Sequence, residues 1–333
     1  MMLEDDYKLK QLIDVFLFEK EANLTYKTLL YYTSCMKYFT DFMVGYLHEP
    51  LDNIKMSDIN LAVLNHYTMW LREKPYAINV PAEEFIKQNE NRHIKNTSIA
   101  TYQRAVKAFF RWAYDNEYTT KNLAQRYKLL KSDAAEKLPL YASEVKIIDD
   151  GFDMKTISGL RNYSIIHLML DCGLRSGEVI RLKLKDVMFE KSVIYIDTSK
   201  GLKSRYIPLP PALKSNLFKY LTFFRGYGDS SSYQTDYFFR SIKTSEPITS
   251  STITQLFRRI KKRTDISRIH PHLCRHTFAT SYILGGGDLE SLRIYMGHSD
   301  ITTTSKYLHL ANSYKMFNTD IYKLDTVFFK KFY

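Results

Sequence analysis

The 333-residue chain contains few cysteines and no long apolar run. Cys35, Cys172 and Cys274 are scattered and odd in number, and none lies in a paired-cysteine motif. Such usage is typical of a reducing compartment, where each thiol packs as a small hydrophobic side chain. No stretch reaches the roughly 18 consecutive apolar residues of a membrane span, so the sequence predicts no membrane partner.

Targeting signals, repeats and low-complexity tracts are also missing. The N-terminal MMLEDDYKLK is acidic and lacks the apolar core of a signal peptide, which favours a cytoplasmic location. Hydrophobic residues make up 45% of the chain and charged residues 25%, an ordinary balance for a soluble globular protein. A chain of this length is predicted to form two domains, each able to bury its own core.

The net charge of +12 is distributed unevenly along the chain. Residues 1–91 carry 9 Lys and Arg against 14 Asp and Glu, a net of −5. Residues 92–138 carry a net of +6, and residues 139–333 a net of +11. This asymmetry favours a polyanionic partner, because cationic side chains that neutralise phosphates release condensed counterions. General solubility charge is the alternative explanation.

The apolar residues of the first third recur at helical spacing. Four helices are expected there, at residues 7–21, from Thr25 to about 46, from about Ser57, and at about 97–117. Residues 75–96 are predicted to form a loop. The polar and basic residues 118–138 are predicted to be a linker that separates an N-terminal domain, residues 1–117, from a C-terminal domain, residues 139–333.

In the second domain, a helix is expected to start near Ser143, and a buried helix to run over residues 161–173. Residues 192–196 and 205–209 are rich in β-branched side chains and are predicted to be the two strands of a hairpin. The basic run RRIKKR, residues 258–263, is placed in a helix that begins near Thr252.

The most informative residues carry cationic, imidazole and phenol groups in a fixed order. HPHLCRHTFAT contains His272 and Arg275, and YMGHSDITTTSKYLHL contains His298 and Tyr307. Arg175 in CGLRSGEVIRL and a lysine, Lys200, in SKGLKSRYIPL precede them. This set suits a phosphodiester: planar guanidinium groups match phosphate oxygens, and a phenol that loses its proton can attack phosphorus. No carboxylate cluster suggests Mg²⁺, so the cations themselves would stabilise the transition-state charge.

Over roughly residues 139–310 the chain resembles the tyrosine recombinases, the family of phage and transposon integrases and Xer-type resolvases. The resemblance implies a mainly α fold, with an N-terminal helical, SAM-like DNA-clamp domain and a mixed α+β catalytic domain that contains a small antiparallel sheet. It implies a site-specific recombinase that cuts and rejoins DNA through a 3′-phosphotyrosyl intermediate. It also implies a reaction that needs no cofactor, metal or ATP. The implied catalytic residues are Arg175, Lys200, His272, Arg275, His298 and Tyr307.

The resemblance also implies a role for each group. Tyr307 would be the nucleophile, with Tyr295 and Tyr314 as the nearest rivals. Arg175 and Arg275 would hold the non-bridging oxygens.

The remaining groups would serve proton transfer and support. Lys200 would protonate the leaving 5′-oxygen, with Lys203 as its rival. His272 could accept the tyrosine proton or bond the phosphate, and His298 could hold the phosphate by a further hydrogen bond. Glu178 and His276 are expected to support these groups.

DNA-binding residues are expected outside the reacting centre. A stripe of basic residues on the helix at 97–117 is usually a solvated face, but the resemblance favours phosphate contacts. Lys203 and Arg205 on the hairpin are expected to contact DNA as well. The helix contributes Arg104, Lys107 and Arg111, and Lys95 stands just before it.

The resemblance implies that the protein acts in the cytoplasm, at the nucleoid, on double-stranded core sites with inverted repeats. It implies a tetramer on two DNA sites, with an accessory factor or a second recombinase as a further partner. An arm-binding domain is not expected ahead of the clamp. The hydrophobic tail from about residue 308 could pack on its own domain or, as the resemblance favours, dock on a neighbouring protomer.

Three alternative functions use the same residues. A type IB topoisomerase shares the chemistry, and a DNA-binding regulator could keep the fold without catalysis. His270, His272, Cys274 and His276 are close enough in sequence to suggest a zinc site, but Leu273 stands where a zinc hydrolase usually has glutamate.

Overall fold

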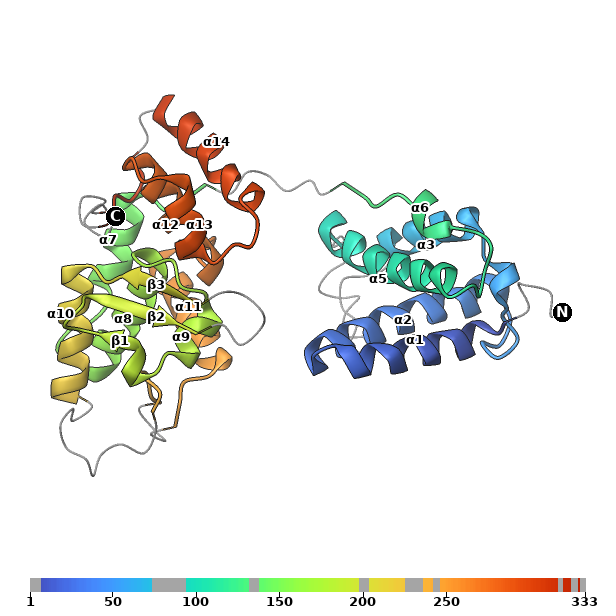
Figure 1. The fold of residues 1–333 in the computed structure, drawn as a ribbon, viewed down its shortest axis with the longest axis horizontal. Coiled ribbons are helices and arrows are strands. Elements are labelled where there is room, and N and C mark those ends of the chain that lie inside the picture. The colour runs from blue at the N-terminus through green and yellow to red at the C-terminus, as the bar shows by residue number, and fades with distance from the viewer. Residues whose placement is uncertain are drawn as a thin grey trace. The chain divides into compact units, whose positions relative to one another are not determined.

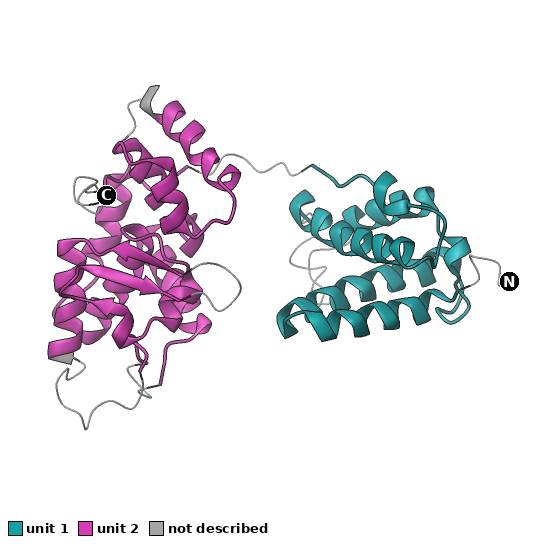
Figure 2. Ribbon diagram, in the orientation of Figure 1, with its two compact units in different colours: residues 1–136 teal, residues 137–333 magenta. Residues whose placement is uncertain are grey.

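The computed structural model describes residues 7–73, 94–131, 138–197, 204–224, 236–241, 246–316, 320–324 and 329. The chain divides into two compact units, residues 1–136 and 137–333, which Figure 2 shows in different colours. Most of the predicted loop at 75–96 lies outside the described residues, as does the hairpin turn with Lys200 and Lys203. Within the described residues, no helix is long and apolar enough to cross a membrane.

Unit 1 is built from helices around an aromatic core (Figure 1). Its elements are α1 (Leu9–Asn23), α2 (Tyr26–Leu47), the 3₁₀ turn η1 (Met56–Asp58), α3 (Leu61–Glu73), α5 (Asn96–Asp115) and α6 (Leu123–Arg126). Phe16, Phe39 and Phe109 are fully buried and meet other rings edge to face, a favourable geometry for aromatic pairs. The third helix begins later than predicted, because Asp58 accepts a hydrogen bond from the Lys55 N–H and closes η1 ahead of it.

The predicted linker at 118–138 differs from the structure in its first half. Asn122 caps the short helix α6 by accepting a hydrogen bond from the Gln125 N–H. Leu123, Ala124 and Tyr127 are buried in the core of unit 1. The sequence suggests a linker there because these three apolar residues stand among polar and basic ones.

Unit 2 is built around two of its own helices, α8 (Ile157–Leu170) and α12 (Pro271–Leu284), which pack against each other. A three-stranded antiparallel sheet lies beside α9 and α10 (Figure 1), in the order β1 (Val187–Met188), β2 (Val193–Ile196), β3 (Arg205–Pro208). The predicted hairpin is present, with Ile194 opposite Ile207. The remaining elements are α7 (Ala142–Asp150), α9 (Ser176–Arg181), the 3₁₀ turn η2 (Leu184–Asp186), α10 (Pro211–Lys219), the π-helical η3 (Tyr220–Phe224), α11 (Ser250–Thr264), α13 (Leu289–Met296) and α14 (Thr302–Met316).

The described part of the C-terminal tail packs on its own unit. The Ala142 N–H donates to Asp320 O, and the Tyr322 N–H donates to Leu140 O. Phe329 is buried against the rings of Phe278, Tyr282 and Tyr295. In this single chain these residues adopt the cis arrangement, because their hydrogen bonds and apolar contacts are made within unit 2. Docking of the tail on a neighbouring protomer stays a prediction. The chain also shows no break at residue 308, since α14 continues to Met316.

Candidate active site

The first guanidinium of the site stands where α8 gives way to α9. Gly173 adopts a positive φ of +66°, and a Cβ there would collide with the Phe278 ring, so the turn requires glycine. Arg175 then caps α9, and its N–H donates to Glu178 Oε2 at 2.8 Å. The Arg175 side chain donates from Nη1 to Glu178 Oε1 at 3.1 Å and from Nη2 to Gly297 O at 3.2 Å.

Arg275 lies on α12 and is almost fully buried, with 5% of its surface exposed. It donates from Nη1 to Gly173 O and from Nη2 to Met296 O. Gly173 and Met296 each stand two residues before another site residue, Arg175 and His298 respectively. By bonding both carbonyls, Arg275 holds the two backbone segments in place. Burial and the Arg175 charge lower the pKa of Arg275 to about 9, which leaves it protonated at neutral pH.

Arg205, at the start of β3, is a third guanidinium in the same cluster. Its Nε donates to Tyr295 O at 2.7 Å, and its Nη2 donates to both Glu178 oxygens at 3.0 and 2.9 Å. Its side chain is 2% exposed. Within the described residues, its buried Nη1 has no hydrogen-bond partner.

Glu178 is the carboxylate at the centre of this arginine cluster, which we define as Arg175, Arg205, Arg275 and Glu178. Burial alone would raise the pKa of the Glu178 carboxyl, but Arg205, the Arg175 N–H and the other two guanidinium groups hold that pKa below its usual value. One carboxylate offsets only one of three positive charges. The cluster therefore keeps a net positive charge in a largely buried setting, which favours binding of an anion.

His298 follows α13 at a turn that requires glycine, because Gly297 has a φ of +57° and an added Cβ would lie 2.9 Å from Arg205 Nη1. Its Nε2 lies 3.4 Å from Arg275 Nη2, and its Nδ1 lies 2.9 Å from Thr304 Oγ1. A guanidinium can only donate, so Nε2 accepts and the Nδ1 proton points at Thr304. Burial and the charges of Arg275 and Arg175 lower the pKa of His298 to about 4, so the ring is neutral at pH 7.

Tyr307 extends from α14 toward this cluster. Its ring centroid is 5.3 Å from that of His276 on α12. Burial raises the pKa of the Tyr307 phenol although Arg275 and Arg175 act to lower it, so the phenol is protonated at neutral pH. Both rival tyrosines are buried. Tyr295 is 3% exposed and packs against Phe329, and Tyr314 is 7% exposed and lies near the end of α14.

The structure brings together Arg175, Arg275, His298 and Tyr307. His272 lies one turn before Arg275 on α12 with its side chain exposed. Lys200 and Lys203 lie outside the described residues. Among the described residues no group of three His, Cys, Asp or Glu side chains converges as metal ligands would, and Cys274 is fully buried whereas His272 is exposed.

The expectation that Arg205 contacts DNA requires correction, because its buried guanidinium is bound to Glu178 and Tyr295 O. Strand alternation could have indicated this position: Arg205, Ile207 and Leu209 fall on one face, and the two apolar residues are buried. Thr304, which is buried and bonded to His298, was also missed.

The basic stripe on α5 is only partly available to a ligand. Lys95 and Arg104 are exposed, but Lys107 donates to Tyr127 O at 3.0 Å and Arg111 pairs with Asp115 at 2.8 Å. Three members of the stripe line a shallow groove between α5 and α6, together with Asn122 and Gln125. These three are Arg104, Lys107 and Arg111.

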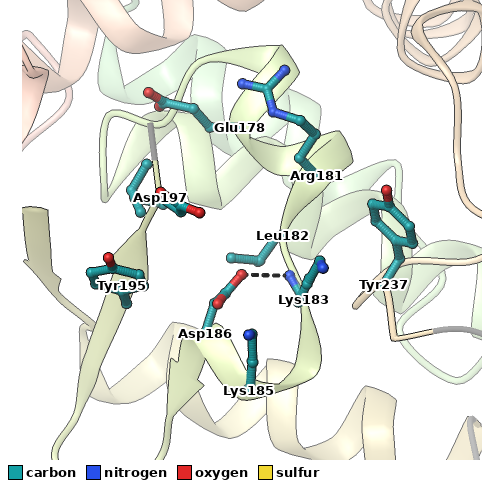
Figure 3. Close-up of a pocket in the computed structure, with 10 residues that line it drawn as sticks. Glu178, Arg181, Leu182, Lys183, Lys185, Asp186, Tyr195, Asp197 and Tyr237 are labelled. Atoms are coloured by element: carbon teal, nitrogen blue, oxygen red, sulfur yellow. Dashed lines mark hydrogen bonds between the residues drawn. The ribbon is translucent and has the colours of Figure 1, made fainter. Parts of the chain in front are cut away.

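A pocket beside the cluster has Glu178 in its wall (Figure 3). Tyr195 and Tyr237 stand on opposite sides of it, and its cations are those of Arg181, Lys183 and Lys185. Asp186 accepts a hydrogen bond from the Lys183 N–H at 2.9 Å, and Asp197 adds a further carboxylate. Because the pocket combines three cations with the three carboxylates of Glu178, Asp186 and Asp197, it does not select an anion as the arginine cluster does.

Comparisons with known proteins agree on both units. The model of the phage integrase family matches residues 140–313, and the phage integrase SAM-like domain matches residues 8–129. A tyrosine recombinase of Pseudothermotoga lettingae is 31% identical over 238 residues, 70% of this chain and 78% of the relative. Tyrosine recombinase XerC of Staphylococcus saprophyticus is 26% identical over 257 residues, 75% and 84% of the two chains.

Among solved structures, the Tn1549 transposon integrase in complex with a circular intermediate DNA superposes with a TM-score of 0.70 at 21% identity, over 89% of this chain and 93% of that one. A lambda integrase dimer bound to a COC′ core site gives 0.66 at 19% identity, over 90% and 95%. At these identities the likeness establishes the shared fold.

Proposed function

Because the chain belongs to the phage integrase family, whose members break and rejoin DNA, we propose that its arginine cluster and Tyr307 form the strand-exchange site of a tyrosine recombinase. Site-specific DNA recombination is the function of the chain. The alternatives, a type IB topoisomerase and a silent regulator, are not favoured by the relatives, which are named as recombinases.

One observation carries the assignment of the site. Three guanidinium groups surround a single carboxylate, and the phenol of Tyr307 lies close enough for two of them to lower its pKa. A phosphodiester supplies the negative charge that this cluster needs. Its non-bridging oxygens also gain charge as the phosphorane forms, so fixed guanidinium donors stabilise the transition state more than the ground state.

In the first step, the Tyr307 oxygen attacks the scissile phosphorus while Arg175 and Arg275 hold the non-bridging oxygens. The phenol proton has to leave, because the raised pKa keeps it on the oxygen at neutral pH. His272 is the proposed acceptor, and the His276 ring against Tyr307 fixes the direction of the phenol. Neutral His298 contributes a hydrogen bond to the phosphate rather than a charge.

The phosphorus–oxygen bond to the 5′ side then breaks, and Lys200 gives a proton to the departing 5′-oxygen. The product is a 3′-phosphotyrosine and a free 5′-hydroxyl. A 5′-hydroxyl from the other duplex reverses the step, so each phosphodiester broken is replaced by another. No ATP, metal or other cofactor is consumed, and cleavage should continue in excess EDTA.

We propose that the partners are double-stranded core sites with inverted repeats and three further copies of the chain, with an accessory factor or a second recombinase where the two half-sites differ. A lambda integrase tetramer bound to a Holliday junction shares the fold at 18% identity and a TM-score of 0.62, which supports this assembly. Two exposed cations, Lys95 at the N-cap of α5 and Arg104 on the helix, would contact the backbone of the core site. Action at the nucleoid follows from this substrate.

Tyr307→Phe tests the assignment. The variant should bind duplex DNA as the wild type does, yet form no covalent adduct on a nicked suicide substrate. Tyr314→Phe is the matched control and should still form the adduct. An adduct formed by Tyr307→Phe, or mapped to Tyr295 or Tyr314, would overturn the role of Tyr307.

A further inference from the structure

Thr304 is a buried polar residue on the helix that carries the nucleophile. It lies on α14, three residues before Tyr307, and its side chain is fully buried. Its hydroxyl oxygen lies 2.9 Å from His298 Nδ1. Thr302 and Thr303, on the same turn of the helix, are exposed instead. The Thr304 hydroxyl is therefore directed at the histidine of the reacting centre and not at solvent.

The two ring nitrogens of His298 face groups of different kinds. Arg275 Nη2 lies 3.4 Å from Nε2 and can only donate, so Nε2 accepts. Burial and the Arg275 charge lower the pKa of His298 to about 4, which leaves the ring with a single proton at neutral pH. That proton is on Nδ1, and the Thr304 oxygen accepts it. The free site therefore holds the Nδ1–H tautomer.

A phosphodiester at the arginine cluster requires the opposite tautomer. An ionised phosphate oxygen only accepts hydrogen bonds, so Nε2 can bond it only after gaining a proton. In a neutral ring, Nδ1 then has no proton and becomes an acceptor. Thr304 suits both forms, because a hydroxyl can donate as well as accept and rotates to match its partner. A carboxylate or a carbonyl beside Nδ1 would instead keep the proton on Nδ1.

The backbone around His298 is held in place, so the exchange involves the ring alone. The His298 N–H donates to Arg293 O at 3.1 Å, and Arg293 Nη1 donates to His298 O at 2.9 Å. The side chain is half-buried, so protons can pass between the ring and solvent. Only the position of one ring proton and the rotation of one hydroxyl have to change.

We propose that Thr304 is a positioning residue that lets His298 exchange tautomers when the scissile phosphate binds. The hydroxyl accepts from Nδ1 in the free protein and donates to Nδ1 in the complex, while the Nε2 proton bonds a non-bridging oxygen. Solvent takes the proton from Nδ1 and supplies the one on Nε2, so the charge of the ring is unchanged. The proposal rests on the proposed function, because it takes the bound phosphate to be the one that Tyr307 attacks.

Nitrogen-15 NMR of labelled histidine rings tests the exchange directly, because the chemical shift distinguishes a protonated ring nitrogen from an unprotonated one. His298→Phe identifies the His298 signals. The free wild type should carry the proton on Nδ1. Tyr307→Phe bound to the nicked suicide duplex, where no adduct forms, should carry it on Nε2. The same tautomer in both samples, or a doubly protonated ring in the complex, would overturn the proposal.

Three variants test the role of the hydroxyl in the reaction. Thr304→Val removes it at nearly constant volume and should slow adduct formation on the nicked substrate about tenfold, the effect of one hydrogen bond, without weakening duplex binding. Thr304→Ser keeps the hydroxyl and should restore the rate to within about twofold. Thr303→Val, at the exposed neighbour on α14, is the matched control and should react as the wild type does.

A double variant separates this role from packing of α14. In the His298→Phe background, Thr304→Val should cause no further loss of rate, because the hydroxyl acts through the ring. A further loss of about tenfold there, or no rescue by Thr304→Ser, would show that Thr304 only packs the helix and would overturn the proposal. Adduct formation by the wild type is scored separately. Its absence would refute the strand-exchange assignment, whereas the variants and the NMR shifts decide the role of Thr304.

Discussion

Replacing Glu178 by glutamine should destabilise unit 2 strongly while leaving unit 1 unchanged. The carboxylate accepts hydrogen bonds on both oxygens, from the Arg175 N–H, from Arg175 Nη1 and from Arg205 Nη2. A glutamine side chain offers one acceptor oxygen and turns an NH₂ group toward a guanidinium. Removing one partner of a buried ion pair typically costs about 3–5 kcal/mol, because the other charge stays buried and unpaired. For a unit of this size that corresponds to a melting temperature lower by about 6–20 °C.

The two tryptophans give this experiment an internal control. Trp70 and Trp112 both lie in unit 1, so tryptophan fluorescence follows the unfolding of that unit, whereas calorimetry records both units. Glu178→Gln should shift a calorimetric transition and leave the fluorescence transition in place. Glu190→Gln, at an exposed carboxylate of unit 2, should shift neither.

Two further measurements test whether the loss of stability comes from the missing negative charge of Glu178 or from the changed shape of the side chain. Duplex DNA should restore more stability to Glu178→Gln than to the wild type, because phosphate replaces the missing negative charge. The double variant Glu178→Gln with Arg205→Met should be more stable than the sum of the single losses predicts, since it removes both charges of the pair. A fall of less than about 2 °C in Glu178→Gln, well under the expected range, would refute the reasoning about the cluster.

Three other changes test the structure. Arg175→Lys keeps the charge but loses the planar fork, so cleavage of a nicked substrate should fall about 10²–10³-fold while duplex binding changes little; equal losses would make Arg175 an ordinary DNA contact. Burial opposes protonation of His167, but Asp171 and Asp149, at 2.8 and 2.9 Å, raise the pKa of His167 to about 10. Protonated His167 therefore contributes its full stabilisation below about pH 6.5, and this contribution is lost as the pH rises toward 10. His167→Asn should lower the free energy of unfolding at pH 6, measured by urea titration, and should flatten its decline with pH. Phe329→Ala should cost about 3–5 kcal/mol, whereas a tail that is dispensable would give no loss.

The sequence predicts the parts of this protein that depend on local signals. Apolar spacing locates the long helices, and β-branched runs on either side of the hairpin turn locate β2 and β3. The order of Arg175, Arg275, His298 and Tyr307 identifies the groups that meet in space. The helix and strand signals are local, whereas these four residues are far apart in the chain and were recognised together through the family resemblance.

Other features depend on contacts between distant residues, which the sequence does not record. Arg205 was expected to contact DNA, but it pairs with Glu178 from another element. The tail resembles an interface helix in composition, and only the bonds of Ala142 and Tyr322 show that it closes its own unit. The short helix α6 is too brief for periodicity to reveal it.

The closure of unit 2 by its tail has a consequence during protein synthesis. Tyr322 and Phe329 complete a backbone pairing and an aromatic core whose other members, Leu140 and Phe278, are made earlier. A nascent chain that has just passed Tyr307 therefore holds the nucleophile but lacks part of its core, and a domain folds as a unit. Unit 2 therefore completes this core only after Phe329 has been made, later than Tyr307 itself.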